Sequence, residues 1–188
     1  MKAIAVTSHK GSGPSVSAPE ILLFPDSSLT VARQPLFLPD FAETWIAHVG
    51  IAVRISRLGK TIASRFASRY YDAVTVALRA VPCGVDAGKA LYTSFDGALT
   101  LGAWIPAEEI DRDKPIMDAA FTPAALSFNA ETVQCRVAEA IEAASAYCTL
   151  KSGDVIIPGW ASVESPLEQR TTVTASLAGH ECLKLKIR

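Results

Sequence analysis

The stretch TLKSGDVIIPG, residues 149–159, decides how the last third of this chain folds. Gly153-Asp154 is a pair typical of tight turns, because glycine reaches backbone conformations that other residues avoid and aspartate bonds to nearby backbone groups. The apolar, β-branched run at residues 155–157 then predicts a short buried strand that finishes at Gly159. We therefore expect a turn that leads into a core strand.

A hairpin is predicted at the end of the sequence, where residues 177–188 read LAGHECLKLKIR. Its strands are expected at residues 171–177 and 182–187. Apolar and basic residues alternate in the second strand, so one face meets the core and the other meets water. The inward residues are Leu183, Leu185 and Ile187, and the outward ones are Lys184, Lys186 and Arg188.

More strands are predicted nearer the N-terminus. Short apolar runs at residues 3–6 and 21–24 flank a loop rich in glycine, serine and proline. Residues 51–55 alternate in hydrophobicity, as a half-buried strand does. Residues 73–81 are almost continuously apolar and predict a central strand buried on both faces. Arg79 interrupts this run, and because a buried guanidinium is costly unless paired, we expect it near the strand's end or facing a cleft.

Two helices are predicted from apolar residues spaced three or four apart. Ile62, Phe66 and Tyr70 indicate a short helix. The second helix follows from the spacing of Val137, Ile141, Ala144 and Cys148. Periodicity alone starts that helix near Glu131. Many short strands with two short helices predict an α+β fold.

The composition bounds the class of protein. At 188 residues, 49% of them hydrophobic, the chain is expected to form one domain. Its net charge of −1 and dispersed basic residues argue against nucleic acid as a partner. No stretch approaches the ~20 apolar residues that cross a membrane, and the N-terminal one is too short for a signal peptide. The 4 cysteines lack metal-site spacing and are expected as reduced, mostly buried thiols of a cytoplasmic protein.

Four stretches together carry a resemblance to a known family: the two quoted above, RISRLGK at residues 54–60 and RYYDAV at residues 69–74. These four stretches resemble the C-terminal domain of bacterial members of the fumarylacetoacetate hydrolase (FAH) family. The resemblance implies a single domain over residues 1–188, with a mostly antiparallel folded sheet (a sandwich-like roll or barrel), two short helices and a homodimeric assembly. It also moves the start of the second helix to about Arg136, because residues 128–134 look like the family's small hairpin.

The family's metal site is where the chain departs from the resemblance. Family members are similar in holding Mg²⁺, Mn²⁺ or Ca²⁺ with three carboxylates, two of them at alternate positions of one strand. Alternate positions point to one face, and hard cations prefer several oxygen ligands. By resemblance, the three positions are His48, Gly50 and Arg79. Because the charge of arginine is permanent and would repel a divalent cation, we expect no metal and no other cofactor.

The chain also lacks the family's residues at other catalytic and substrate-binding positions. The family's catalytic histidine follows the first strand, and His9 is either its remnant or a solvated side chain. A lysine that precedes the family's Ser-Phe-Asp-Gly motif corresponds to Thr93. Where the family has a glycine-bearing loop near the substrate, Trp160 is expected to fill the substrate's volume. The vestigial catalytic positions are thus His48, Gly50, Arg79, Thr93 and Trp160.

His48 and Arg79 are the candidate ligand-binding residues. An alternative for His48 is a softer metal such as zinc, although no cysteine or carboxylate lies nearby at fixed spacing. Arg79 either offers its charge to a keto acid or another small carboxylate, in place of the metal, or forms an ion pair in a closed pocket. The acids considered for that ion pair are Asp72, Asp86 and Glu108.

Three hypotheses for the function remain open. In the first, the chain is a catalytically impaired family member, a pseudoenzyme with a degenerate metal site that binds a ligand or acts as a scaffold. In the second, relocated ligands hold Mg²⁺, Mn²⁺ or Ca²⁺, and the chain is a hydrolase or lyase that cuts a carbon–carbon bond in acylpyruvate-like diketo acids. In the third, it is a subunit that needs an active paralogue. The missing metal ligands and lysine favour the first hypothesis.

Overall fold

The computed structural model describes residues 1–7, 20–85, 88, 90–110, 117–121, 124–128, 130–160 and 165–188. Its strands are β1 (Lys2–Thr7), β2 (Glu20–Pro25), β3 (Leu29–Val31), β4 (Thr44–Ile55), β5 (Tyr71–Cys83), β6 (Leu99–Leu101), β7 (Ile105–Pro106), β8 (Met117–Phe121), β9 (Ala124–Phe128), β10 (Val155–Ile157), β11 (Ser165–Pro166), β12 (Thr172–Leu177) and β13 (His180–Lys186). Its α-helices are α1 (Leu91–Ser94) and α2 (Ala130–Tyr147), and its 3₁₀ turns are η1 (Asp26–Ser28), η2 (Ser64–Arg69) and η3 (Ala107–Glu109). The predicted α+β class is confirmed.

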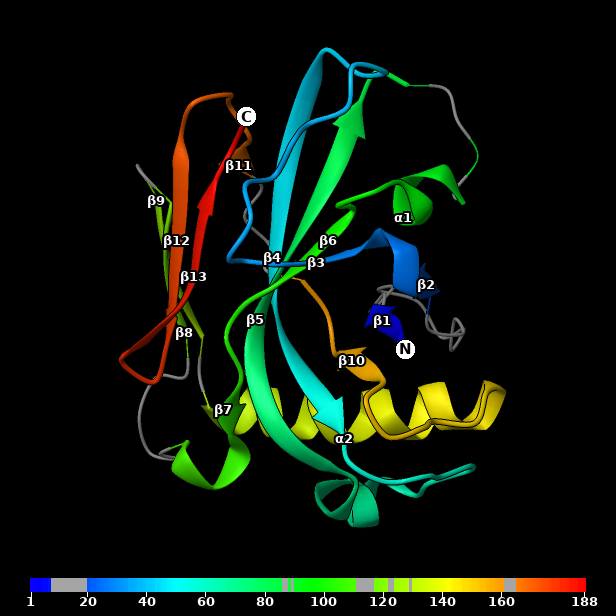
Figure 1. Cartoon of the computed structure of the whole chain (residues 1–188). Coiled ribbons are helices and arrows are strands. Elements are labelled where there is room, and N and C mark those ends of the chain that lie inside the picture. Colours follow the sequence, from blue (N-terminus) through cyan, green and yellow to red (C-terminus); the bar gives the residue numbers. More distant parts are fainter. Residues whose placement is uncertain are drawn as a thin grey trace, which may run out of the picture.

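A large sheet and a small sheet make up the β structure of these residues (Figure 1). In the large sheet the strands run in the order β2-β1-β10-β4-β5-β6-β3, with β11 beside β4 and β7 beside β5. The small sheet has the order β13-β12-β8-β9 and is antiparallel. The long antiparallel pair β4–β5 runs through the centre of the molecule and separates β1, β2 and β10 from the small sheet.

The large sheet is mixed, whereas the sequence predicts a mostly antiparallel one. β1 pairs in parallel with β10, and β3 pairs in parallel with β6. Parallel partners need a long connection, so they come from distant parts of the chain. The direction of such a pairing depends on the tertiary fold, and the local hydrophobic pattern carries no signal for it.

The two sheets meet at Gly102, directly after β6. The N–H of Ala103 donates to the carbonyl oxygen of Cys182 in β13 at 2.7 Å, and a Cβ atom on Gly102 would lie 2.7 Å from the same oxygen. A residue without a side chain is therefore needed for this approach. In the C-terminal strand the predicted alternation is confirmed: Leu183, Leu185 and Ile187 are buried, and Lys184, Lys186 and Arg188 are exposed.

The predicted turn at Gly153-Asp154 is also confirmed. Gly153 has a φ of +88°, in the left-handed region that favours glycine. Asp154 is only 3% exposed, and its carboxylate accepts the backbone N–H of Lys2 at 3.2 Å and that of Lys151 at 2.9 Å. It also pairs with the ammonium group of Lys2. One buried carboxylate thus joins β1 to the turn that precedes β10.

The second helix corrects two predictions made from the family resemblance. α2 starts at Ala130, next to the start that periodicity gives, and not near Arg136. The hairpin expected at residues 128–134 is wrong, because the hairpin of this region is β8–β9. Alanine and glutamate dominate residues 130–147 and favour helix.

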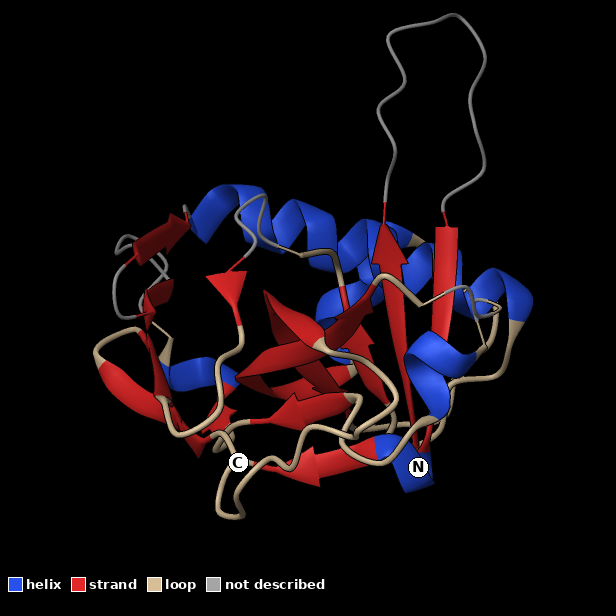
Figure 2. Cartoon of the chain, turned by 90° about the horizontal axis from the view of Figure 1, so that it is seen from above, coloured by secondary structure: helices blue, strands red, loops and turns tan. Residues whose placement is uncertain are grey.

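With 18 residues, α2 is not the short helix that was predicted. It packs against β1 and β10, and Figure 2 shows this long helix along one side of the strands. Neither α2 nor any other helix of the described residues is long and apolar enough to span a membrane.

The short helix predicted over residues 62–70 forms only the 3₁₀ turn η2. Ile62 is buried just before this turn, and its N–H donates to Ser145 Oγ of α2 at 2.8 Å. Phe66 lies on the outside, 39% exposed. Contacts with α2 hold the segment, and the apolar spacing does not continue into a regular helix.

The cysteines that the structure describes with their side chains are free thiols. Cys182 is buried, and burial raises the pKa of its thiol. Cys83 and Cys148 are half-buried. For these three residues the expectation of free thiols is confirmed, but only Cys182 is buried as predicted.

Candidate functional site

Strands β4 and β5 bring the predicted site residues together. His48 lies directly opposite Arg79 across the strand pair, and Gly50 lies opposite Ala77. Because side chains alternate along a strand, His48 and Gly50 point to one face, and the direct partner of His48 points to the same face. The three positions that the resemblance assigns to metal ligands therefore lie side by side in the large sheet.

Arg79 places a half-buried cation in this group of residues. Its Cζ atom lies 5.9 Å from the centre of the Phe24 ring, which is fully buried in β2. Burial lowers the pKa of the guanidinium, and the negative charge of Glu20 at the start of β2 acts against this effect. The Nε atom of Arg79 is buried and has no hydrogen-bond partner in the described part of the chain.

Trp160 packs beside Gly50. A Cβ atom on Gly50 would lie 2.4 Å from the carbonyl oxygen of Gly159 and 3.2 Å from Cε3 of the indole. The indole also meets the Phe24 ring edge to face, with ring centres 6.4 Å apart. Its Nε1 atom is buried and has no acceptor among the described residues. The Gly159-Trp160 segment thus fills the space that a side chain at position 50 would need.

The acids considered as partners of Arg79 lie elsewhere. Asp72 accepts two hydrogen bonds from Arg54, at 2.9 Å and 3.1 Å. Glu108 belongs to η3, which follows β7, and β7 pairs with the opposite end of β5 from Arg79. Asp86 lies outside the described residues.

Glu20 is the acid near Arg79 that the sequence analysis missed. A signal was present, because Glu20 and Phe24 occupy alternate positions of one strand and therefore share a face with Leu22. The start of β2 was predicted one residue later, at residue 21, which excluded the glutamate. Sequence reasoning also missed Phe24, the ring that Arg79 and Trp160 both approach.

Thr93 comes from a separate element, a short helix and not the strand pair β4–β5. It is buried in the short helix α1, where its hydroxyl donates to the carbonyl oxygen of Ala90 at 3.3 Å. α1 packs against β2, the strand that carries Glu20 and Phe24, and against η1. His9 lies outside the described residues.

The residues at the predicted metal positions do not fit a divalent cation. They offer an imidazole at His48, no side chain at Gly50 and a permanent positive charge at Arg79. Hard divalent cations require several oxygen ligands. Within the described ranges, no group of three or more histidine, cysteine, aspartate or glutamate side chains is placed to hold a metal ion.

The architecture defines a class of protein: a mixed sheet built on a long antiparallel strand pair, with a small antiparallel sheet packed beside it. The family model described as fumarylacetoacetate (FAA) hydrolase C-terminal matches residues 3–188. The chain belongs to this family, so the resemblance drawn from its sequence is confirmed. A search of curated proteins finds no match.

Solved structures with this fold include isomerases and hydrolases. A 5-carboxymethyl-2-hydroxymuconate delta-isomerase from Mycobacterium smegmatis is similar with a TM-score of 0.84 at 21% identity, over 99% of this chain and 76% of that chain. A 2-hydroxyhepta-2,4-diene-1,7-dioate isomerase from Mycobacterium marinum has a TM-score of 0.82 at 21% identity, over 99% and 73%. Fumarylpyruvate hydrolase from Pseudomonas aeruginosa, in complex with Mn²⁺ and pyruvate, has a TM-score of 0.81 at 15% identity, over 99% and 88%.

Proposed function

We propose that this FAH-family chain is catalytically impaired and binds a small carboxylate at Arg79 without a metal ion. The observation that carries the proposal is a pair of buried N–H donors, Arg79 Nε and Trp160 Nε1, which have no acceptor among the described residues. Both side chains approach the Phe24 ring. An unmet buried donor costs about 1–3 kcal/mol, and a ligand with acceptor oxygens would remove that cost.

A carboxylate suits these donors better than a neutral ligand does. A guanidinium presents a planar fork of N–H donors that matches the two oxygens of a carboxylate. Arg79 would thus supply, in the place that the resemblance gives to the metal, a fixed positive charge. The negative charge of Glu20 acts on the same guanidinium. Glu20 therefore offsets part of the positive charge that Arg79 offers a ligand.

A small ligand suits the surroundings of Arg79. The rings of Phe24 and Trp160 meet at an interplanar angle of 71° and form an apolar wall. Trp160 already fills the space beside Gly50. Pyruvate, which is bound in the fumarylpyruvate hydrolase structure, and oxalate, which resembles an enolate, are suitable probes.

Arg79→Met should weaken this binding while the fold is kept, because methionine replaces much of the arginine stem and removes only the charge and the donors. Titration calorimetry of chelator-treated protein with pyruvate and with oxalate measures the effect. We expect saturable binding to the unchanged chain and an affinity at least tenfold lower, about 1.4 kcal/mol, in the variant. Arg33→Met removes an exposed arginine elsewhere and should leave the affinity unchanged.

Two results would overturn the proposal. If Arg79→Met and the unchanged chain bound both probes equally, the guanidinium would not be the binding group. If binding required Mg²⁺ or Mn²⁺, or if the protein cleaved an acylpyruvate-like diketo acid, the metal-dependent hydrolase or lyase would be established instead.

The proposal places the protein in the cytoplasm as a homodimer, with no membrane or nucleic acid partner. Reduced thiols at Cys83, Cys148 and Cys182 suit a reducing compartment. The homodimer is the assembly that the family resemblance implies. Light scattering on the purified chain tests the assembly, and co-purification of a catalytically active relative would point to the mixed assembly instead.

A further inference from the structure

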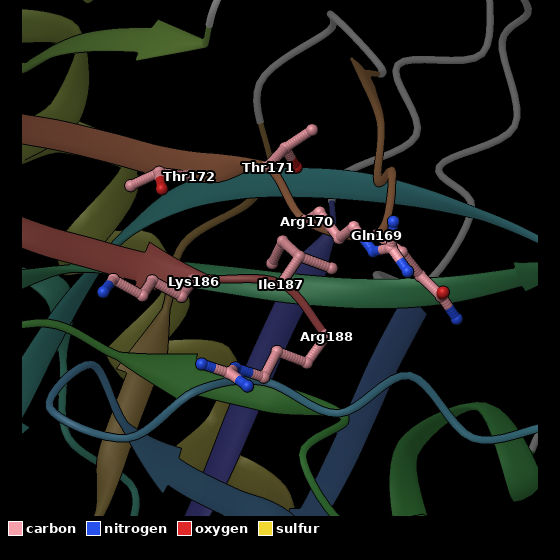
Figure 3. Close-up of a pocket in the computed structure, with 7 residues that line it drawn as sticks. All are labelled: Gln169, Arg170, Thr171, Thr172, Lys186, Ile187 and Arg188. Carbon is pink, nitrogen blue, oxygen red and sulfur yellow. The ribbon is translucent and has the colours of Figure 1, made fainter.

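A pocket of about 490 Å³ lies where β13 ends, beside the segment that leads into β12 (Figure 3). We name it the C-terminal basic pocket. The side chains of its lining that matter here are Gln169, Arg170, Thr171, Thr172, Lys186 and Arg188. A volume of this size is typical of small-molecule sites. The pocket shares no residue with the group around Arg79.

The lining of the C-terminal basic pocket is cationic. Arg170, Lys186 and Arg188 are all exposed, and no aspartate or glutamate belongs to the lining, whose one anionic group is the α-carboxylate of Arg188. In the part of the chain that the structure describes, none of the three lies in an ion pair, since the pairs are Met1 with Asp26, Lys2 with Asp154 and Arg54 with Asp72. Gathering like charges raises the energy of the site, and an anion would lower it.

Backbone groups around the pocket are already used within the fold. The N–H of Arg170 donates to the carbonyl oxygen of Ile187, and the N–H of Ile187 donates to that of Thr171, both at 2.9 Å. The main-chain oxygen of Arg188 accepts the N–H of Leu38 at 3.0 Å. The hydroxyl of Thr171 also donates within the fold, to the carbonyl oxygen of Glu168 at 2.6 Å. An anionic ligand would therefore be held by the three cationic side chains, the hydroxyl of Thr172 and one amide.

The backbone of Arg170 gives an independent reason to assign a role to its side chain. Its φ is +65°, in the left-handed region that glycine adopts without strain and other residues adopt at a cost. A turn needs no arginine at such a position for its own stability. The strained backbone therefore holds this cationic side chain against a pocket with two further cations.

We infer that the C-terminal basic pocket binds a ligand with two or more anionic groups, phosphates or carboxylates. Figure 3 shows Lys186 and Arg188 extending to one side of Ile187, with Arg170 and Gln169 on the other. One charged group of the ligand would meet each side, so a multiply charged ligand gains more than a single anion does. This site is additional to the proposed function, and neither depends on the other.

Titration of the full chain with tripolyphosphate and with citrate tests the inference, since the two probes distinguish phosphate from carboxylate ligands. We expect saturable binding to at least one of them, which weakens steeply as NaCl rises from low to about physiological concentration. Arg170→Gly should lower that affinity about tenfold, as expected for the loss of one charge-assisted contact. The same variant should melt at an unchanged or higher temperature, because glycine relieves the strained backbone.

The matched control pair is Lys186→Gln and Lys184→Gln. Both lysines are exposed on β13 and lose the same charge, but only Lys186 lines the pocket. Lys186→Gln should weaken binding and Lys184→Gln should not. Equal effects of the two variants, or no saturable binding of either probe, would overturn the inference. Arg79→Met should leave this binding unchanged, so the inference and the proposed function can fail separately.

Discussion

Gly50→Ala should lower the free energy of unfolding by about 3 kcal/mol, at the upper end of what overpacking a well-packed interior costs. The added Cβ atom would lie 2.4 Å from the carbonyl oxygen of Gly159, which is backbone and cannot rotate away. It would also press on the indole of Trp160 at 3.2 Å. Either β4 or the segment after β10 must move. Urea denaturation of the variant and the unchanged chain measures the difference.

Gly88→Ala is the control for this prediction. Nothing lies within 4 Å of a Cβ atom at Gly88, so its stability should change by about 0.5 kcal/mol or less. If Gly50→Ala were as stable as Gly88→Ala, the packing of Gly159 and Trp160 over β4 would be wrong.

The contact of Gly159 and Trp160 with position 50 also limits which side chains could bind a metal ion there. Gly50→Glu introduces an acid at a position where the family resemblance implies a carboxylate, but the side chain has no room beside Gly159 and Trp160. We expect no Mn²⁺ binding by this variant in calorimetry. Saturable Mn²⁺ binding by the variant would contradict the packing of Gly159 and Trp160 against position 50.

Asp154→Ala should cost about 3–5 kcal/mol of unfolding free energy, the range for removing one partner of a buried ion pair. The substitution leaves the backbone N–H groups of Lys2 and Lys151 without their acceptor, and the ammonium of Lys2 without its anion. It also breaks the link between β1 and the turn before β10. The midpoint and slope of a denaturant titration give the value.

Asp72→Ala provides the comparison, because it also removes a paired aspartate. The pair of Asp72 with Arg54 is exposed, with 47% and 40% of the two side chains accessible. Exposed ion pairs contribute about 0–1 kcal/mol, so this variant should be nearly as stable as the unchanged chain. Equal losses for the two variants would show that Asp154 acts as an ordinary surface charge.

The site could be predicted from the sequence in part. The resemblance assigned His48, Gly50 and Arg79 to metal positions, and the structure brings them to one face of β4 and β5. Phe24 and Glu20 were not found, because they reach Arg79 from β2, a strand that lies three places from β4 in the sheet order. No spacing along the chain records such an approach.

Features that depend on residues close together along the chain could be predicted from the sequence. The turn at Gly153-Asp154, the alternation in the last strand and the start of α2 next to Glu131 all follow from local backbone preferences and hydrophobic period. The resemblance gave the family correctly, yet it misplaced the helix start that periodicity had right.

The tertiary structure alone decided the contacts between distant segments. These are the parallel pairing of β1 with β10, the packing of Gly159 and Trp160 against Gly50, and the cationic pocket between the ends of β12 and β13. Each of these contacts depends on the twist of the strands and on which strand edges pair with each other. Those quantities are set by the packing of the whole core, because a strand's sequence specifies which face is buried but not which strand will lie beside it.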